Sequence, residues 1–129
     1  MLAAYGADMA DDTPRDWARP VVHWSIDAVD PAAQREFYRA MFSWDIADGV
    51  FMDIPAGFGG PEPGPGGHIQ PGERPGVSLF VQVRDVHESL DRATALGGTV
   101  LAEPFQLPGQ PTLAQIADPE GNPVMLVQQ

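Results

Sequence analysis

The side chains that could do chemistry include two histidines set among alternating apolar residues. His23 lies within the apolar segment 21–26, and Ser25 follows it by two positions. His68 and Gln70 are spaced in the same way. Alternation with a period of two predicts strands whose polar residues share one face. Imidazoles on such a face can ligate a divalent metal, exchange a proton or hydrogen-bond a bound molecule.

A second alternating segment, 77–83, places Ser78, Phe80 and Gln82 on the face opposite to its aliphatic residues. Phe51 lies in a further strand expected over 50–54. Aromatic rings of this kind stack on planar molecules. The alternative is that these rings fill a core, and the sequence leaves both interpretations open.

His23 is the candidate catalytic residue, because an imidazole titrates near neutral pH. Three carboxylates, Asp45, Asp53 and Glu103, are further candidate bases, although no spacing pairs them with a partner. The chain has no cysteine, and so no thiol nucleophile, disulfide or thiolate metal site. It also lacks a nucleophile elbow, a phosphate-binding glycine loop before a helix and an HExxH motif.

The composition is that of one small, acidic, turn-rich domain. The 129 residues are 43% hydrophobic, which is enough for one core, and 14 glycines with 14 prolines favour short strands over long helices. The net charge of −11 would repel a phosphate backbone, so we expect no nucleic-acid partner. No apolar run reaches the roughly 18 residues that span a membrane. The absence of cysteine fits a reducing compartment, so we expect a cytoplasmic protein.

The elements that must position these side chains repeat along the chain. Asp30 is expected to cap a helix over 31–41, with Ala33, Phe37 and Met41 as its buried stripe. Asp85 is expected to cap a second helix that ends at Gly97-Gly98, with Val86, Leu90 and Ala93 facing inward. The expected strands are 21–26, 44–46, 50–54 and 68–70, then 77–83, 99–102, 112–117 and 124–128. The two caps lie 55 positions apart, and the same offset carries His23 onto Ser78. The sequence therefore predicts two tandem βαβββ units.

The domain boundaries follow from composition. We expect residues 1–19 to form a flexible N-terminal arm and 20–129 to form a single domain. Its two units are expected at about 20–70 and 76–129. The Pro/Gly-rich stretch 55–76 is expected to connect them.

Five motifs, in order along residues 20–129, resemble those of the vicinal oxygen chelate superfamily of glyoxalases, bleomycin-resistance proteins and extradiol dioxygenases. They are Asp30-Pro31 with Glu36-Phe37-Tyr38, Phe42-Ser43-Trp44, Val83-Arg84-Asp85-Val86, Ala95-Leu96-Gly97-Gly98 and Asp118-Pro119-Glu120-Gly121-Asn122. Ser43 departs from the pattern, because the family signature has glycine there. The resemblance implies an α+β fold in which the two units form a curved mixed sheet around a cleft, with both helices on the convex side.

The same resemblance implies where a divalent metal would be held in enzymes of the superfamily. The four equivalent positions are His23, either Gln70 or His68, Ser78 and Met125. A hydroxyl and a thioether are poor ligands for a hard divalent ion. We therefore expect no metal cofactor; if a divalent metal does bind, His23 and His68 are its expected ligands.

The function expected from the sequence is small-molecule binding of the bleomycin-resistance type. A planar or cationic drug or metabolite would be sequestered in an apolar cleft without metal. The alternative is a glyoxalase-like lyase or isomerase, or another enzyme of the superfamily, that uses His23. We expect the chain to form a homodimer, as small members of the family do. The expected ligand-binding residues are His23, Ser25, Phe51, His68, Gln70, Ser78, Phe80, Gln82 and Met125.

Overall fold

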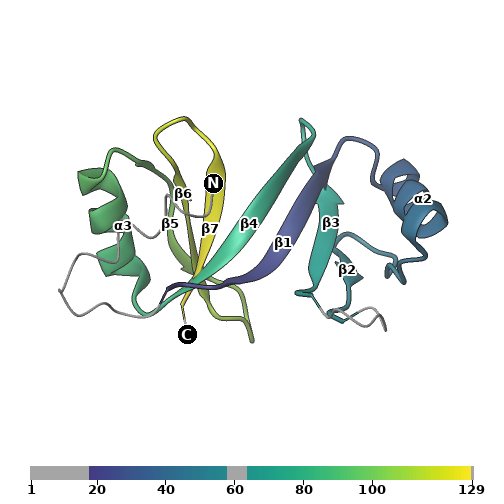
Figure 1. The fold of residues 1–129 in the computed structure, drawn as a ribbon, viewed down its shortest axis with the longest axis horizontal. Helices are drawn as coiled ribbons and strands as arrows, with labels where there is room; N and C mark the ends of the chain where they lie inside the picture. The colour runs from purple at the N-terminus through teal and green to yellow at the C-terminus, as the bar shows by residue number, and fades with distance from the viewer. Residues whose placement is uncertain (1–17, 58–63, 129) are drawn as a thin grey trace, which may run out of the picture.

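A computed structural model describes residues 18–57 and 64–128. Within them, seven strands form one mixed, open sheet and two helices lie at its opposite ends (Figure 1). The elements are β1 (Val21–Ala28), α2 (Pro31–Phe42), β2 (Met52–Ile54), β3 (Gly67–Pro71), β4 (Gly76–Val83), α3 (Val86–Ala95), β5 (Thr99–Gln106), β6 (Thr112–Ala117) and β7 (Pro123–Gln128). The strand order is β2-β3-β1-β4-β7-β6-β5. The α+β class predicted from the sequence is confirmed.

The two predicted units meet at the centre of this sheet, where β1 and β4 pair antiparallel. Trp24 pairs with Leu79, the residue 55 positions later, so an approximate twofold axis passes through this pair. Within each unit the first strand runs parallel to the last, β1 beside β3 and β4 beside β7. The side chains of both units on one face of the sheet therefore converge on a common space.

Both helices begin where the sequence predicts. Asp30 Oδ1 accepts a hydrogen bond from the backbone N–H of Ala33 at 3.2 Å. Asp85 Oδ1 accepts from the N–H groups of His87 and Glu88 at 2.9 and 3.2 Å. These bonds satisfy amide groups that have no partner inside the first turn of a helix.

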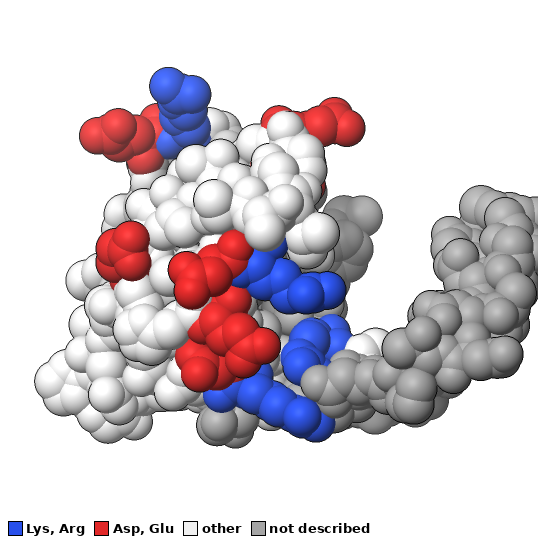
Figure 2. Space-filling view, turned by 90° about the vertical axis from the view of Figure 1, so that its left-hand side faces the viewer, with Lys and Arg blue, Asp and Glu red and all other residues white. Residues whose placement is uncertain are grey.

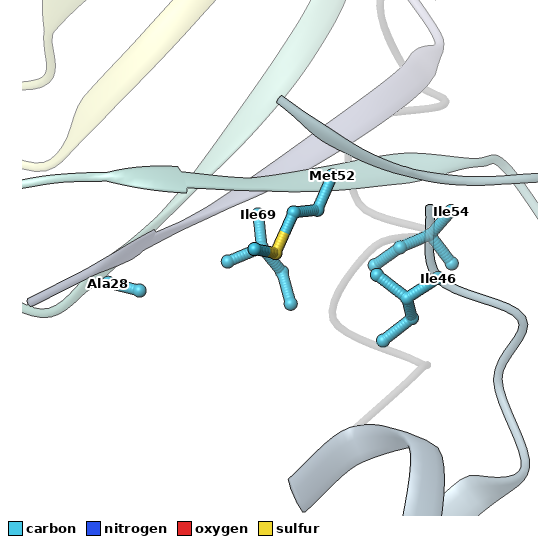
Figure 3. Close-up of a cluster of buried hydrophobic side chains, with 5 residues drawn as sticks. All are labelled: Ala28, Ile46, Met52, Ile54 and Ile69. Carbon is cyan, nitrogen blue, oxygen red and sulfur yellow. The ribbon is translucent and has the colours of Figure 1, made fainter. Parts of the chain in front are cut away.

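The core is divided between the two units. One buried cluster comprises Ala28, Ile46, Met52, Ile54 and Ile69. Its strand residues extend from the sheet toward the side on which α2 lies, and Ile46 meets them from the loop before β2 (Figure 3). The other comprises Val83, Val86, Leu90, Ala114 and Leu126. Val86 and Leu90 come from α3, as predicted, and Ala93 is partly buried. The sheet thus has a packed face toward the helices and leaves its other face for the cleft.

The predicted buried stripe of α2 is wrong. Phe37 and Met41 are 57% and 63% exposed, Ala33 is exposed as well, and no residue of α2 is buried. Instead, the helix contacts its unit through Tyr38, which stacks on Trp44 with 5.2 Å between ring centroids.

The strand predicted over 44–46 is also absent. The carbonyl of Ile46 accepts a hydrogen bond from Arg35 Nε at 2.9 Å, and no strand of the sheet pairs with this segment. The side chain of Ile46 is nevertheless buried in the first core cluster. Its apolar character therefore reflects burial in a loop.

The family resemblance implies that the aliphatic face of β4, opposite to the cleft, packs against the helices, but Val77 and Leu79 on that face are 63% and 47% exposed. The helices lie at opposite ends of the sheet, so neither covers these central positions (Figure 1). Val22 of β1 lines the cleft, because the pairing of β1 with β4 shifts register between Val21 and His23. Trp24 and Ile26 pack against the first core cluster as expected.

The strand predicted at 68–70 is confirmed as the centre of β3. Residues 1–17 of the expected arm and 58–63 of the expected connection lie outside the described residues. No helix in the described ranges is long and apolar enough to cross a membrane.

Candidate functional site

A cleft of about 700 Å³ lies on the face of the sheet away from the core clusters, between the two units. Eight of the nine expected ligand-binding residues line it: His23, Ser25, Phe51, His68, Gln70, Ser78, Phe80 and Met125. Gln82 does not line it. The backbone N–H of Gln82 donates to the carbonyl of Pro20, which precedes β1, so this end of β4 extends past the start of β1.

Other cleft residues were not among those expected to bind. Asp27 and Asp53 come from the first unit, and the second unit adds Phe105, Leu107, Gln110, Pro111, Leu113, Gln115 and Val127. Strand alternation was a usable signal for Asp27, which follows Ser25 by two positions, and for Leu113 and Gln115 of β6. The loop between β5 and β6 carries no periodicity from which its position over the cleft could be derived. Asp45 and Glu103, the other candidate bases, do not line the cleft.

A chain of hydrogen bonds joins four side chains of the first unit. His23 Nε2 lies 2.8 Å from His68 Nδ1, and His68 Nε2 lies 2.8 Å from Gln70 Oε1. Gln70 Nε2 donates to Asp27 Oδ1, also at 2.8 Å. We call this His23–His68–Gln70–Asp27 chain the relay.

The relay has a direction. A carboxylate oxygen only accepts, so the amide nitrogen of Gln70 must face Asp27 and the amide oxygen must face His68. His68 therefore carries its proton on Nε2 and, as a neutral imidazole, accepts at Nδ1. His23 then donates from Nε2, which leaves the lone pair of neutral His23 on Nδ1. The tautomers of both histidines follow from a single carboxylate at the end of the chain.

Aromatic rings enclose the two imidazoles. Phe80 lies edge-on to both, with ring centroids 4.9 Å from His23 and 5.9 Å from His68. Phe51 lies edge-on to His68 at 5.9 Å. Burial is the main cause that lowers the pKa of His23 below its ordinary value of 6.5; neighbouring His68 lowers it further, and Asp53 opposes both. His23 is thus favoured in the neutral form that the relay requires.

The register of β3 brings the relay together. Ser25 pairs with His68 and Asp27 with Gln70 in the parallel ladder of β1 and β3. One position earlier, Gly67 lies against the indole of Trp24, and a Cβ at residue 67 would collide with that ring. The indole Nε1 also donates to the carbonyl of Pro65 at 3.1 Å. Only a residue without a Cβ fits against the indole in this register, which places His68 beside His23.

The same ladders decide between His68 and Gln70 as the position equivalent to Met125. Ser25 and Phe80 are related by the 55-residue offset; Ser25 pairs with His68, and Phe80 pairs with Met125. His68 is therefore the equivalent of Met125. Subtracting the 55-residue offset from Met125 gives Gln70 instead, because the second unit is two residues longer between its helix cap and its last strand.

The four positions that would hold a metal in the superfamily are therefore His23, His68, Ser78 and Met125, all of which line the cleft. This set does not fit a divalent ion. The facing nitrogens of the two imidazoles are hydrogen-bonded to each other, and the remaining donors are a hydroxyl and a thioether. No group of three or more His, Cys, Asp or Glu side chains in the described part of the chain is placed to hold a metal.

Solved structures share this architecture of paired units around a cleft. A hypothetical protein of Bacillus halodurans superposes with a TM-score of 0.63 at 12% identity, covering 88% of this chain and 96% of its own. A glyoxalase/bleomycin resistance protein/dioxygenase superfamily member of Vibrio splendidus gives 0.58 at 16% identity, covering 86% and 98%. Methylmalonyl-CoA epimerase of Mycobacterium tuberculosis gives 0.57 at 16% identity, covering 84% and 86%. At such identities the likeness to these structures establishes the fold alone.

A family model gives the more particular assignment. The model for the glyoxalase-like domain matches residues 23–127, which is nearly the whole described chain. The chain belongs to this family. No curated protein matches it.

Proposed function

We propose that the protein binds a planar small molecule in its cleft without a metal ion, as drug-sequestering proteins of the bleomycin-resistance type do. The observation that carries the proposal is the composition of the cleft at the family metal positions. Two of the four are occupied by a mutually hydrogen-bonded histidine pair, and the other two by a serine and a methionine.

The second unit supplies a surface for such a molecule. Phe80 and Met125 pair on adjacent strands, and Phe105, Leu107 and Leu113 line the same space. Aromatic rings offer planar faces for stacking, and a methionine side chain adapts to irregular shapes. A cleft of about 700 Å³ has the size of small-molecule sites in general.

The test uses Nile red, an uncharged planar dye whose fluorescence rises in apolar surroundings. We expect saturable binding that is unchanged after treatment with a chelator. Phe80→Ala should weaken it about ten- to hundredfold, because an aromatic contact contributes on the order of 1–3 kcal/mol. His23→Ala should cost less than Phe80→Ala.

Phe37→Ala is the matched control, since Phe37 is an exposed ring of α2 that does not line the cleft. It should bind the dye like the parent. The proposal fails if chelation abolishes binding, or if folded Phe80→Ala protein behaves like Phe37→Ala.

A second candidate function is acid–base catalysis by His23, as a lyase or isomerase, and the relay favours it. A neutral imidazole with its lone pair on Nδ1 can remove a proton from a carbon next to a carbonyl and return a proton from solvent. Incubating acetophenone in deuterated water tests this directly. Deuterium entering the methyl group faster with the parent than with His23→Gln would support catalysis, and equal rates would exclude it for this probe.

We propose a homodimer on the basis of the apolar residues left uncovered at the middle of the sheet, Val77 and Leu79. Light scattering at micromolar concentration should give twice the chain mass of 13.9 kDa. A monomer would refute it. A cytoplasmic location stays part of the proposal, supported by the lack of cysteine.

A further inference from the structure

Among the described residues, the titratable groups that line the cleft all lie in the first unit. They are His23, Asp27, Asp53 and His68. The local twofold and the strand ladders relate these positions to Ser78, Gln82, Gln115 and Met125, none of which titrates. The two units have the same backbone arrangement, yet the first half of the cleft carries ionisable side chains at positions where the second half carries none.

The charged half offers hydrogen-bond acceptors to a ligand. Within the relay, Nε2 of His23 donates its proton to a hydrogen bond with His68, and Nδ1 of His23 has no hydrogen-bond partner among the described residues. Asp27 accepts from Gln70 through Oδ1, so Oδ2 keeps its acceptor capacity. Asp53 lies opposite His68 in the ladder of β2 and β3 and is exposed. The hydroxyl of Ser25 can donate or accept a hydrogen bond, so it favours neither a donor nor an acceptor on the ligand.

Within the described part of the chain, no basic side chain offsets the two carboxylates, since none of the residues that line the cleft there is arginine or lysine. All seven basic residues of the chain are arginines. Three of them, Arg19, Arg84 and Arg92, border a separate groove beside α3, where arginine and acidic side chains lie next to one another (Figure 2). The groups that would attract an anion are therefore outside the cleft.

We infer that the cleft selects an organic cation that donates hydrogen bonds, such as a protonated amine, amidinium or guanidinium, carried on an aromatic or apolar body. The inference rests on the proposed function and adds the ligand's class and orientation. The cationic head lies between Asp27, Asp53 and His23. The body lies over Phe80 and Met125 of the second unit.

Four naphthalene probes of nearly equal size test the class: naphthylmethylammonium, its N-trimethyl form, naphthylmethanol and naphthoate. Calorimetric titration should show the primary ammonium binding about tenfold more tightly than the alcohol, because carboxylates near the head favour a positive charge. Naphthoate should bind most weakly. The trimethyl form, which has the charge but no N–H, should fall between the ammonium and the alcohol.

Variants locate the head group. Asp53→Asn should weaken ammonium binding about fivefold and weaken alcohol binding by a smaller factor. Asp91→Asn is the control, because it makes the same charge change on the exposed surface of α3, outside the cleft. Its ammonium binding should equal that of the parent.

Imidazole nitrogen shifts measured by NMR test the direction of the relay without any ligand. In the parent, Nδ1 of His23 should be the unprotonated nitrogen. Gln70→Met breaks the relay and should give a mixture of tautomers, whereas an unchanged His23 spectrum would show that the relay does not set the tautomer.

The outcomes separate the two proposals. Alcohol or naphthoate binding as tightly as the ammonium would overturn the cation inference and leave small-molecule binding intact. A trimethyl form as tight as the primary ammonium would overturn the requirement for a donor. If neither Nile red nor any naphthalene binds, both proposals are wrong.

Discussion

Replacing Gly67 by alanine should disturb both stability and the site, because this glycine lies under the indole of Trp24. The added Cβ would collide with the ring, so β3, the indole or both must shift. Trp24 packs on the first core cluster and its Nε1 is held by Pro65, which limits how far the ring can yield. Overpacking of this kind costs about 1–3 kcal/mol of unfolding free energy.

Urea unfolding followed by tryptophan fluorescence measures this cost. Gly76→Ala is the matched control, because a Cβ at Gly76, in β4, would meet no atom within 4 Å. We expect Gly67→Ala to lower the unfolding midpoint clearly. Gly76→Ala should change the free energy of unfolding by no more than about 0.5 kcal/mol, as is usual for surface substitutions, and so leave the midpoint nearly unchanged. A shift of β3 would also move His68 away from His23, so their imidazole signals should change in Gly67→Ala alone.

Equal midpoints for the two variants would refute the reasoning. They would mean that the indole moves aside at little cost and that the β1–β3 register depends on other contacts. Unchanged imidazole signals in a destabilised Gly67→Ala variant would have a narrower meaning: the glycine would contribute to packing without positioning the relay.

Three further predictions concern charge, capping and metal. Burial lowers the pKa of His23 below 6.5, so on acidification the imidazole is protonated in the unfolded chain before it is protonated in the folded one. The free energy of unfolding should therefore fall as the pH drops below 6.5. Urea melts of His23→Gln should show a smaller fall over the same pH range. Asp85→Ala removes two hydrogen bonds to the first turn of α3 and should cost about 1 kcal/mol in thermal unfolding, whereas exposed Asp91→Ala should cost less. The double variant Ser78→His, Met125→Glu supplies metal ligands at the two family positions that lack them, so calorimetry should show Zn²⁺ binding that the parent does not show. If the double variant binds no more Zn²⁺ than the parent, the assigned equivalence of these positions is wrong.

Most of the fold could be predicted because its signals are local. The capping aspartates, Asp30 and Asp85, mark both helices, and period-two alternation marks the long strands. Two wrong predictions, the strand at 44–46 and the buried stripe of α2, have a common cause: they depend on tertiary packing, which local sequence periodicity does not report. Ile46 is buried in a loop, so its apolar segment does not form a strand. Helix α2 contacts its unit through Tyr38, which stacks on Trp44, while the apolar side chains of Phe37 and Met41 stay exposed.

The cleft could be predicted in outline for the same reason, since alternation assigns faces. Its chemistry could not, because the relay depends on relations between strands. Whether His68 or Gln70 faces His23 is decided by the register of β3 on β1, and the repeat offset gives the wrong choice when the two units differ in length by two residues. The close contact of Gly67 with Trp24, which this register requires, joins residues 43 positions apart.

The duplication accounts for how one frame can support two kinds of site. Two equivalent units place four side chains around a common centre, an arrangement suited to a metal ion when all four are ligands. In this chain the first unit keeps imidazoles at its two positions and connects them through Gln70 to Asp27. The second unit has a hydroxyl and a thioether at its two positions, so its half of the cleft contacts a ligand mainly through apolar side chains, whereas the first half contributes the carboxylates. A symmetric backbone with asymmetric side chains favours a ligand whose two ends differ.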